Sequence, residues 1–222
     1  MNRNIYDMVL YVQWLVELLL LVVAIVARLK RRGPKYLQNF YWYPLVLISS
    51  LGVYYLTFFK LLDGQIFIML NNLLMLFHFT FLGYTIIQLL DKSGKTNWMR
   101  FLFISIVVLM IPIIYFKLRE FPYASIPFAI SNLGLIVFSG YYFFKLFSEF
   151  KETDPLQLPS VWLVLGIFVF GIFVIPGSLF DVYIKEKGSK EAYFMIYYVF
   201  QFAYFLRHFC FLRAYYLGFK LG

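Results

Sequence analysis

The stretch IFIMLNNLLMLFHFTFLGYTIIQLL, residues 66–90, decides the fold of this chain. It carries no Asp, Glu, Lys or Arg and is long enough to cross a lipid bilayer as a helix, since one crossing needs about 20 apolar residues. Asn71, Asn72 and His78 lie within it, and hydrocarbon penalises such polar groups unless they find partners. Asn71, His78 and Thr85 recur every seventh residue, so they share one face of the helix. We therefore expect the other helices to pack around this one.

The composition of the whole chain is that of a membrane protein. Hydrophobic residues make up 63% of its 222 residues, charged residues only 14%, and the mean hydropathy is +0.78. Soluble domains are about half apolar and a quarter charged. The net charge of +9 would favour nucleic acid as a partner of a soluble protein. Here basic loops held on one side of a membrane explain the charge, so no nucleic-acid partner is expected.

Seven hydrophobic segments predict an all-α, polytopic membrane bundle of seven transmembrane helices, forming a single domain over residues 1–222. The first segment is longer than the core of a signal peptide and lacks a clean small-residue cleavage site, so it is interpreted as an uncleaved span. The loops are too short to hold a soluble domain. The expected spans are residues 9–29, 41–62, 66–90, 98–116, 122–147, 160–182 and 192–216.

Lys and Arg are distributed unevenly over the two ends of the predicted bundle. Twelve of the twenty fall on one side, many of them between Arg28 and Lys35, and seven fall on the other, while Arg207 lies inside a span. Positive charge is retained in the cytoplasm. The N-terminus is therefore expected outside and the C-terminus in the cytoplasm, in the lipid bilayer of a bacterial inner (plasma) membrane.

Polar side chains fall inside the predicted spans, and a rise of about 1.5 Å per residue places Glu17, His78, Asn132 and Gln201 near one level. Two asparagines lie above that level, and Arg207 and His208 lie somewhat below it. One interpretation is a ligand or ion pathway in the outer half of the bundle, and the other is a set of interhelical hydrogen bonds that only holds the bundle together. The candidates are Glu17, Asn71, Asn72, His78, Asn132, Gln201, Arg207 and His208. A carboxylate at the depth of Glu17 is expected to be protonated or paired with His78 or Arg207.

No cofactor, metal or enzymatic activity is expected from the motifs. Cys210 is the single cysteine, which excludes an intramolecular disulfide and a cysteine metal cluster. His78 and His208 could ligate a haem from two sides, but their estimated depths differ by about one helical turn and neither lies in a haem motif. No nucleotide-binding glycine loop, GxSxG or HExxH occurs in the sequence.

Two five-residue segments suggest an internal repeat. HFTFL at residues 78–82 and HFCFL at residues 208–212 each follow an aromatic-rich helix pair that begins at Trp42 or Trp162. Spans one to three and five to seven would then be parallel repeats joined by span four, a 3+1+3 arrangement related to that of some small transporters. Chance similarity is the alternative in a chain so rich in Phe and Leu.

Three parts of the chain together resemble a known group of proteins. They are Asn71–Tyr84, the segment LPSVWLVLGIFVF at residues 158–170, and the aromatic last span with its short basic tail. They are similar to the uncharacterised small seven-transmembrane proteins of Bacteroidota that are often encoded beside sensor kinases or response regulators. This chain departs from them in having His78 where an acidic residue is expected. The resemblance implies a membrane component of a signalling or envelope system that acts through partners.

Three functions remain open from the sequence. The first is an integral membrane sensor or accessory subunit that acts through other membrane or cytoplasmic proteins, because its loops carry no output domain. The second is a small solute or proton-coupled transporter lined by the intramembrane polar residues, and the third is a purely structural subunit of an envelope complex. The candidates for docking a partner are Arg31, Arg32, Lys35, Glu149, Glu152 and Asp154.

Overall fold

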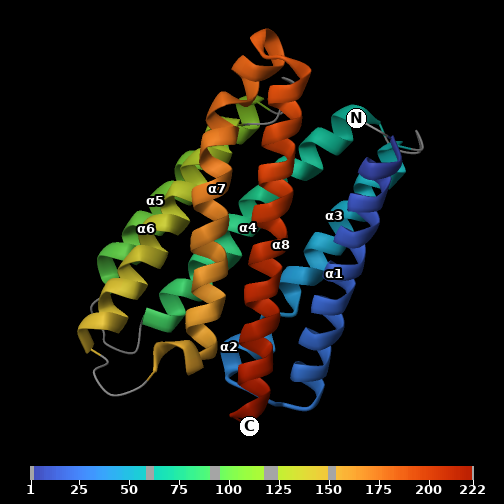
Figure 1. Ribbon diagram of the computed structural model, residues 1–222. Helices are drawn as coiled ribbons and strands as arrows, with labels where there is room; N and C mark the ends of the chain where they lie inside the picture. Colours follow the sequence, from blue (N-terminus) through green and yellow to red (C-terminus); the bar gives the residue numbers. More distant parts are fainter. Residues whose placement is uncertain (1–2, 59–62, 91–95, 118–124, 150–153, 222) are drawn as a thin grey trace.

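The computed structural model describes residues 3–58, 63–90, 96–117, 125–149 and 154–221. Over these ranges the chain forms α helices and one short 3-10 helix, without a strand, which confirms the all-α prediction (Figure 1). The elements are α1 (Arg3–Leu29), α2 (Lys35–Asn39), α3 (Trp42–Phe58), α4 (Gly64–Leu90), α5 (Asn97–Lys117), α6 (Ser125–Glu149), η2 (Pro155–Gln157), α7 (Pro159–Lys187) and α8 (Lys190–Lys220).

The long helices follow the predicted spans but extend beyond several of them. α1 begins six residues before the expected start at residue 9, and α7 continues to Lys187, through residues expected to form a charged turn. The hydroxyl of Ser189 begins α8 by accepting a hydrogen bond from the backbone N–H of Ala192 at 3.3 Å. A hydrogen bond with Ser189 also lowers the pKa of the exposed Glu191 in the first turn. Residues 59–62, the expected end of the second span, lie outside the described residues.

Five helices are long and apolar enough to cross a membrane. The qualifying segments are Tyr11–Leu29 of α1, Asn72–Leu90 of α4, Asn97–Tyr115 of α5, Phe128–Ser148 of α6 and Pro159–Leu179 of α7. The chain is therefore a multi-pass membrane protein. α3, with 17 described residues, and α8, which carries Arg207 and Arg213, do not meet the same criterion.

Six of the long helices form a closed ring. Around it α1 packs against α3, α3 against α4, α4 against α6, α6 against α7, α7 against α8, and α8 against α1. α5 packs outside the ring on α4 and α6, at one edge of the molecule in Figure 1. α4 runs diagonally behind α7 and α8 in that view and contacts α2, α3, α5, α6 and α7. α4 therefore has five neighbours but is one member of the ring, and α1 and α8 pack mainly on each other and on α3 and α7.

The short helix α2 closes the end of the bundle at which the C-terminus lies, opposite the N-terminus (Figure 1). Leu37 of α2 is buried, and Tyr215 of α8 donates a hydrogen bond to the Leu37 carbonyl at 3.1 Å. Gly33 (φ +78°) precedes α2, and a Cβ added there would lie 3.3 Å from the carbonyl oxygen of Gly218. This close backbone approach favours glycine at both positions. α2 was not predicted, because its five residues carry no helical periodicity of their own and depend on α8.

Candidate functional site

Polar side chains from four helices meet inside the ring. We call this group the interior polar cluster, and its burial is extreme for ionisable groups: Glu17 is 1% exposed, Arg207 2% and His208 0%. Such groups lie inside a membrane bundle only where they are paired, hydrated or bound to something else. The members are Glu17 from α1, Tyr43 from α3, His78 from α4, and Tyr204, Arg207 and His208 from α8.

Arg207 links the members of the interior polar cluster. The carbon centre of its guanidinium lies 3.9 Å from the ring centroid of Phe170 in α7, 5.1 Å from that of Tyr204 and 5.7 Å from that of Tyr43. These are cation–π distances, and such contacts stabilise a cation that has lost its water. They involve ring faces and do not satisfy the N–H groups of the guanidinium. Nε and Nη1 of Arg207 are buried without a hydrogen-bond partner.

Glu17 carries the opposite charge in the same cluster. The charge of Arg207 acts on its carboxyl group, and Gln13, one turn earlier on α1, forms a hydrogen bond with it. The two charged groups nevertheless make no hydrogen bond with each other, and Glu17 Oε2 is buried without a partner. Of the two neighbours predicted for Glu17, Arg207 is therefore the one whose charge reaches it, without forming a direct ion pair.

The two histidines meet in this cluster, although their estimated depths had separated them. Nδ1 of His78 lies 3.0 Å from the hydroxyl oxygen of Tyr43, and Nδ1 of His208 donates to the carbonyl of Tyr204 at 2.8 Å. The second bond assigns Nε2 of a neutral His208 as an acceptor. Nε2 of each histidine is buried without a partner. The described residues hold no group of three or more His, Cys, Asp or Glu arranged for a metal ion.

The remaining intramembrane candidates are not joined to the cluster by any described contact. Asn132 of α6 is fully buried, and its Nδ2 donates to the Phe128 carbonyl of its own helix at 2.8 Å. Asn72 Nδ2, Asn132 Oδ1 and Gln201 Oε1 are buried without a partner. The side chain of Asn71 lies outside the described residues. Four of the eight candidates therefore belong to the cluster, and similar depth alone does not bring Asn132 and Gln201 to it.

The described basic docking candidates lie at the end of the bundle closed by α2. Arg31, Arg32 and Lys35 are exposed there. Asp154 is also exposed, and its carboxylate accepts a hydrogen bond from the backbone N–H of Leu156 at 3.0 Å, which caps η2. Glu152 and the side chain of Glu149 lie outside the described residues. The basic part of the predicted docking surface is therefore described in full, and the acidic part only at Asp154.

Three aromatic residues of the site were missed in the sequence. Tyr204 carries a usable signal, because it precedes His208 by four residues and so lies on the same helical face. Tyr43 belongs to an aromatic run that suggested a membrane interface, yet it is 1% exposed whereas the adjacent Trp42 is 50% exposed. Phe170 has no local signal among the many phenylalanines, and only the packing of α7 against α8 brings it to Arg207.

Replacing Tyr43 with phenylalanine is expected to lower the free energy of unfolding by about 1 kcal/mol, because Nδ1 of His78 loses its partner. The Tyr43 ring would keep its packing against Phe40 and Phe211, at centroid distances of 5.1 and 5.7 Å. The matched control is Tyr41→Phe, since the described contacts of Tyr41 with its neighbours are made by its ring. Denaturation of both variants in the same detergent measures the difference between their free energies of unfolding. Equal stability of the two would show that the Tyr43–His78 hydrogen bond contributes nothing.

Comparison with known proteins identifies no relative of this chain. No protein-family model matches the chain, and no curated protein or solved structure is significantly similar to it. The fold and the site therefore define it as a helical, multi-pass membrane protein with a buried polar cluster.

Proposed function

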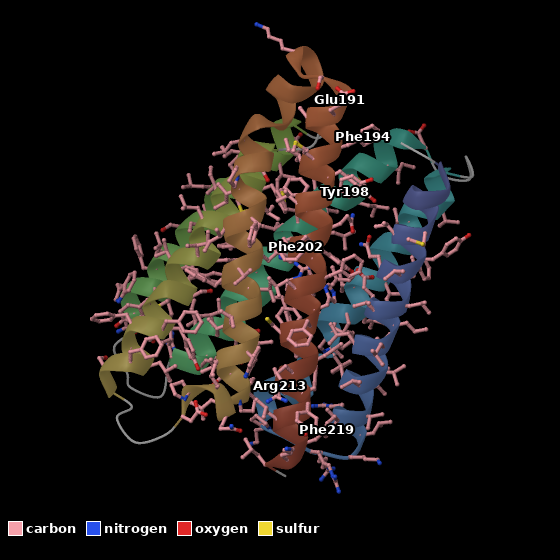
Figure 2. All side chains as sticks on the ribbon, viewed as in Figure 1. Glu191, Phe194, Tyr198, Phe202, Arg213 and Phe219 are labelled. Carbon is pink, nitrogen blue, oxygen red and sulfur yellow. The ribbon has the colours of Figure 1, made fainter. Side chains whose placement is uncertain are left out.

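We propose that the protein crosses the membrane seven times, with α3 and α8 completing the set of spans. α8 supports this, since 31 residues of helix extend about 46 Å, more than the roughly 30 Å of a hydrocarbon core. Its charge at Arg207 is directed into the ring, whereas Phe202 and Phe209 are exposed. In Figure 2 the rings of Phe194, Tyr198 and Phe202 follow one another along the outward side of α8. A charged inner face and an aromatic outer face suit a helix between protein and lipid.

The end of the bundle that carries α2 is the cytoplasmic end in this proposal. The exposed basic residues Arg31, Arg32 and Lys35 lie there, as does Lys220 at the end of α8 (Figure 2 shows nearby Arg213 and Phe219). Positive charge is retained in the cytoplasm in bacterial inner membranes. The N-terminus then lies outside.

Cysteine labelling tests this orientation. A membrane-impermeant thiol reagent applied to intact cells or spheroplasts is expected to label Gly188→Cys, in the exposed α7–α8 turn, and to spare Arg31→Cys until the membrane is opened. The parent chain is the control, because its single cysteine, Cys210, is 2% exposed. The reverse labelling pattern would overturn the orientation.

We infer that the protein is a ligand-binding membrane sensor or accessory subunit that acts through a protein partner. One observation carries this proposal, namely the unpartnered polar atoms of Glu17, Arg207 and His208 at a site with almost no exposure. Buried polar groups of native proteins are nearly always satisfied by protein, water or ligand. A purely structural cluster would satisfy its groups with one another. The short loops leave output to a partner, and the basic cytoplasmic end is the surface offered to it.

Native mass spectrometry of the protein, gently extracted from its own membrane, tests the sensor proposal. We expect a complex heavier than the 26.5 kDa chain that resolves into this chain and a second polypeptide. Reversing charge at Arg31, Arg32 and Lys35 to Glu is expected to release that polypeptide. Lys187→Glu, an exposed lysine at the opposite end, is the matched control. The docking proposal is wrong if the partner stays bound to the triple variant, or if the chain is always found alone.

A small solute or proton-coupled transporter is the second candidate. The closed ring favours it, because two consecutive helix triplets, α1–α3–α4 and α6–α7–α8, follow each other around it as a parallel duplication would require. His78 and His208 would then be equivalent residues of the two repeats. This candidate predicts uptake of solute by proteoliposomes that is lost in Glu17→Gln while the protein remains folded. Partner binding without any uptake would favour the sensor.

A further inference from the structure

The charges of Glu17 and Arg207 act on each other inside the ring without a direct hydrogen bond between them. Each side chain is buried, each acts electrostatically on the other, and yet Glu17 Oε2 and Arg207 Nε and Nη1 all lack hydrogen-bond partners. A direct ion pair would have satisfied atoms on both sides at once. Two buried charges that do not pair directly and keep unpartnered polar atoms are strongly unfavourable, because both have lost their hydration. Something with its own hydrogen-bonding groups therefore belongs next to Arg207.

The free groups of the cluster identify the chemistry that would fill this place. Arg207 offers N–H donors on two of its nitrogens, and Tyr204 offers a buried hydroxyl without a partner. The guanidinium carbon lies close to the rings of Phe170 and Tyr204, and these ring contacts leave the N–H groups of Nε and Nη1 without a hydrogen-bond partner. Arginine binds anions through the N–H groups that lie in the plane of its guanidinium. A small anion could accept from several of these donors at once.

Charge balance then requires a proton. When Glu17 is ionised, its charge balances that of Arg207, and adding an anion then leaves one uncompensated negative charge in a buried site. Protonation of Glu17 removes this extra negative charge. Arg207 and Tyr43 interact with Glu17 electrostatically, and Gln13 is its hydrogen-bond partner on its own helix. The other titratable groups of the cluster are His78 from α4 and Tyr204 and His208 from α8. Among them Glu17 is the one that carries a negative charge when ionised at neutral pH.

We propose that the interior polar cluster binds a small monovalent anion against Arg207 and that Glu17 takes up one proton from solution as the anion enters. The proposal rests on the proposed ligand-binding function and specifies its ligand class. The anion brings one negative charge, the proton converts the Glu17 carboxylate to a neutral carboxylic acid, and no covalent bond is formed or broken except that O–H bond. The two sources of this chemistry are a halide and a small carboxylate.

Titration calorimetry on the full chain in lipid nanodiscs tests the proposal, with chloride, bromide, formate and acetate as separate probes. Repeating each titration in two buffers of different ionisation enthalpy gives the number of protons taken up per anion. We expect saturable binding with one proton taken up, and an affinity that falls about tenfold for each unit of pH rise while free Glu17 is ionised. A halide-only or carboxylate-only response identifies the source of the anion.

Two variants separate the roles of the charged groups. Glu17→Gln keeps the size of the side chain, and we expect it to bind the anion without proton uptake and without the tenfold dependence on pH. Arg207→Gln is expected to weaken binding by at least a hundredfold. Arg213→Gln is the matched control, since Arg213 lies on the same helix near Trp162 and Tyr216, away from the cluster. If Arg207→Gln does not fold, the Glu17→Gln titration still decides the matter.

Three outcomes would overturn the proposal: no probe binds, an anion binds without a proton, or Glu17→Gln keeps the proton uptake. Two further results distinguish a wrong ligand class from a site that binds no ligand at all. If a neutral polar molecule co-purifies with the chain and is lost in Arg207→Gln while every anion fails, the site binds a ligand of another class. If ordered water alone fills the site, both proposals fail.

Discussion

Replacing Arg207 with methionine is expected to lower the free energy of unfolding by about 3–5 kcal/mol, the effect of removing one partner from a buried pair of opposite charges. The loss leaves Glu17 as an uncompensated carboxylate in the bundle interior. It also removes the cation that lies 3.9 Å from the Phe170 ring. Methionine retains most of the length and apolar contact of the arginine side chain, so a cavity contributes little. Denaturation in a fixed detergent or lipid environment measures the change.

The double variant Arg207→Met with Glu17→Gln distinguishes charge from packing. Once Glu17 is neutral, methionine at position 207 leaves no unbalanced charge, and much of the lost stability is expected to return. Arg213→Met is the control on the same helix. Arg213 is only partly buried, and its removal is expected to change the stability by less than about 1 kcal/mol. A double variant no more stable than Arg207→Met alone would contradict the charge-balance argument.

Replacing Gly166 with alanine is expected to destabilise the bundle by about 1–3 kcal/mol, because α7 and α8 have no room for an added methyl group. A Cβ at Gly166 would lie 2.9 Å from Cys210 Cβ and 3.0 Å from the Arg207 carbonyl oxygen. Backbone atoms cannot move aside as a flexible side chain can, so the two helices must separate. That separation also moves Phe170, one turn along α7, away from Arg207.

Gly140→Ala is the matched control for this prediction. Gly140 lies within α6, and an added Cβ there meets nothing within 4 Å. Alanine favours a helix over glycine by up to about 1 kcal/mol. Gly140→Ala is therefore expected to leave stability unchanged or to raise it, whereas Gly166→Ala lowers it. If both substitutions have the same effect, the contact between α7 and α8 is looser than described.

The helices were predictable because long apolar runs between charged loops leave a chain few alternatives in a bilayer. Residues 66–90 became α4 with a broad set of neighbours, as expected from their length and polar face. The short helix α2 was not predictable. Its position depends on Tyr215 and Gly218, which lie about 180 residues further along the chain. Local periodicity cannot encode such a contact.

The interior polar cluster was predictable in part. Depth, at about 1.5 Å per residue, selects residues at one level of the membrane, and the level that contains Glu17 and His78 also contains Asn132 and Gln201, which no described contact joins to the cluster. The direction of a side chain around its helix axis is a second requirement. Tyr43 and Trp42 are neighbours in sequence, yet one faces the interior and the other is exposed, and only the packing of α3 between α1 and α4 decides which.

The central claim is that a bound species lies beside Arg207 within the helix ring. A crystal structure from a lipidic mesophase containing bromide, with anomalous diffraction recorded at the bromine edge, tests it most directly. We predict density in the plane of the guanidinium, within hydrogen-bonding distance of Nε or Nη1, with an anomalous peak if the species is a halide. A direct Glu17–Arg207 ion pair with no density between the two side chains would contradict the claim and make the cluster a structural element of the bundle.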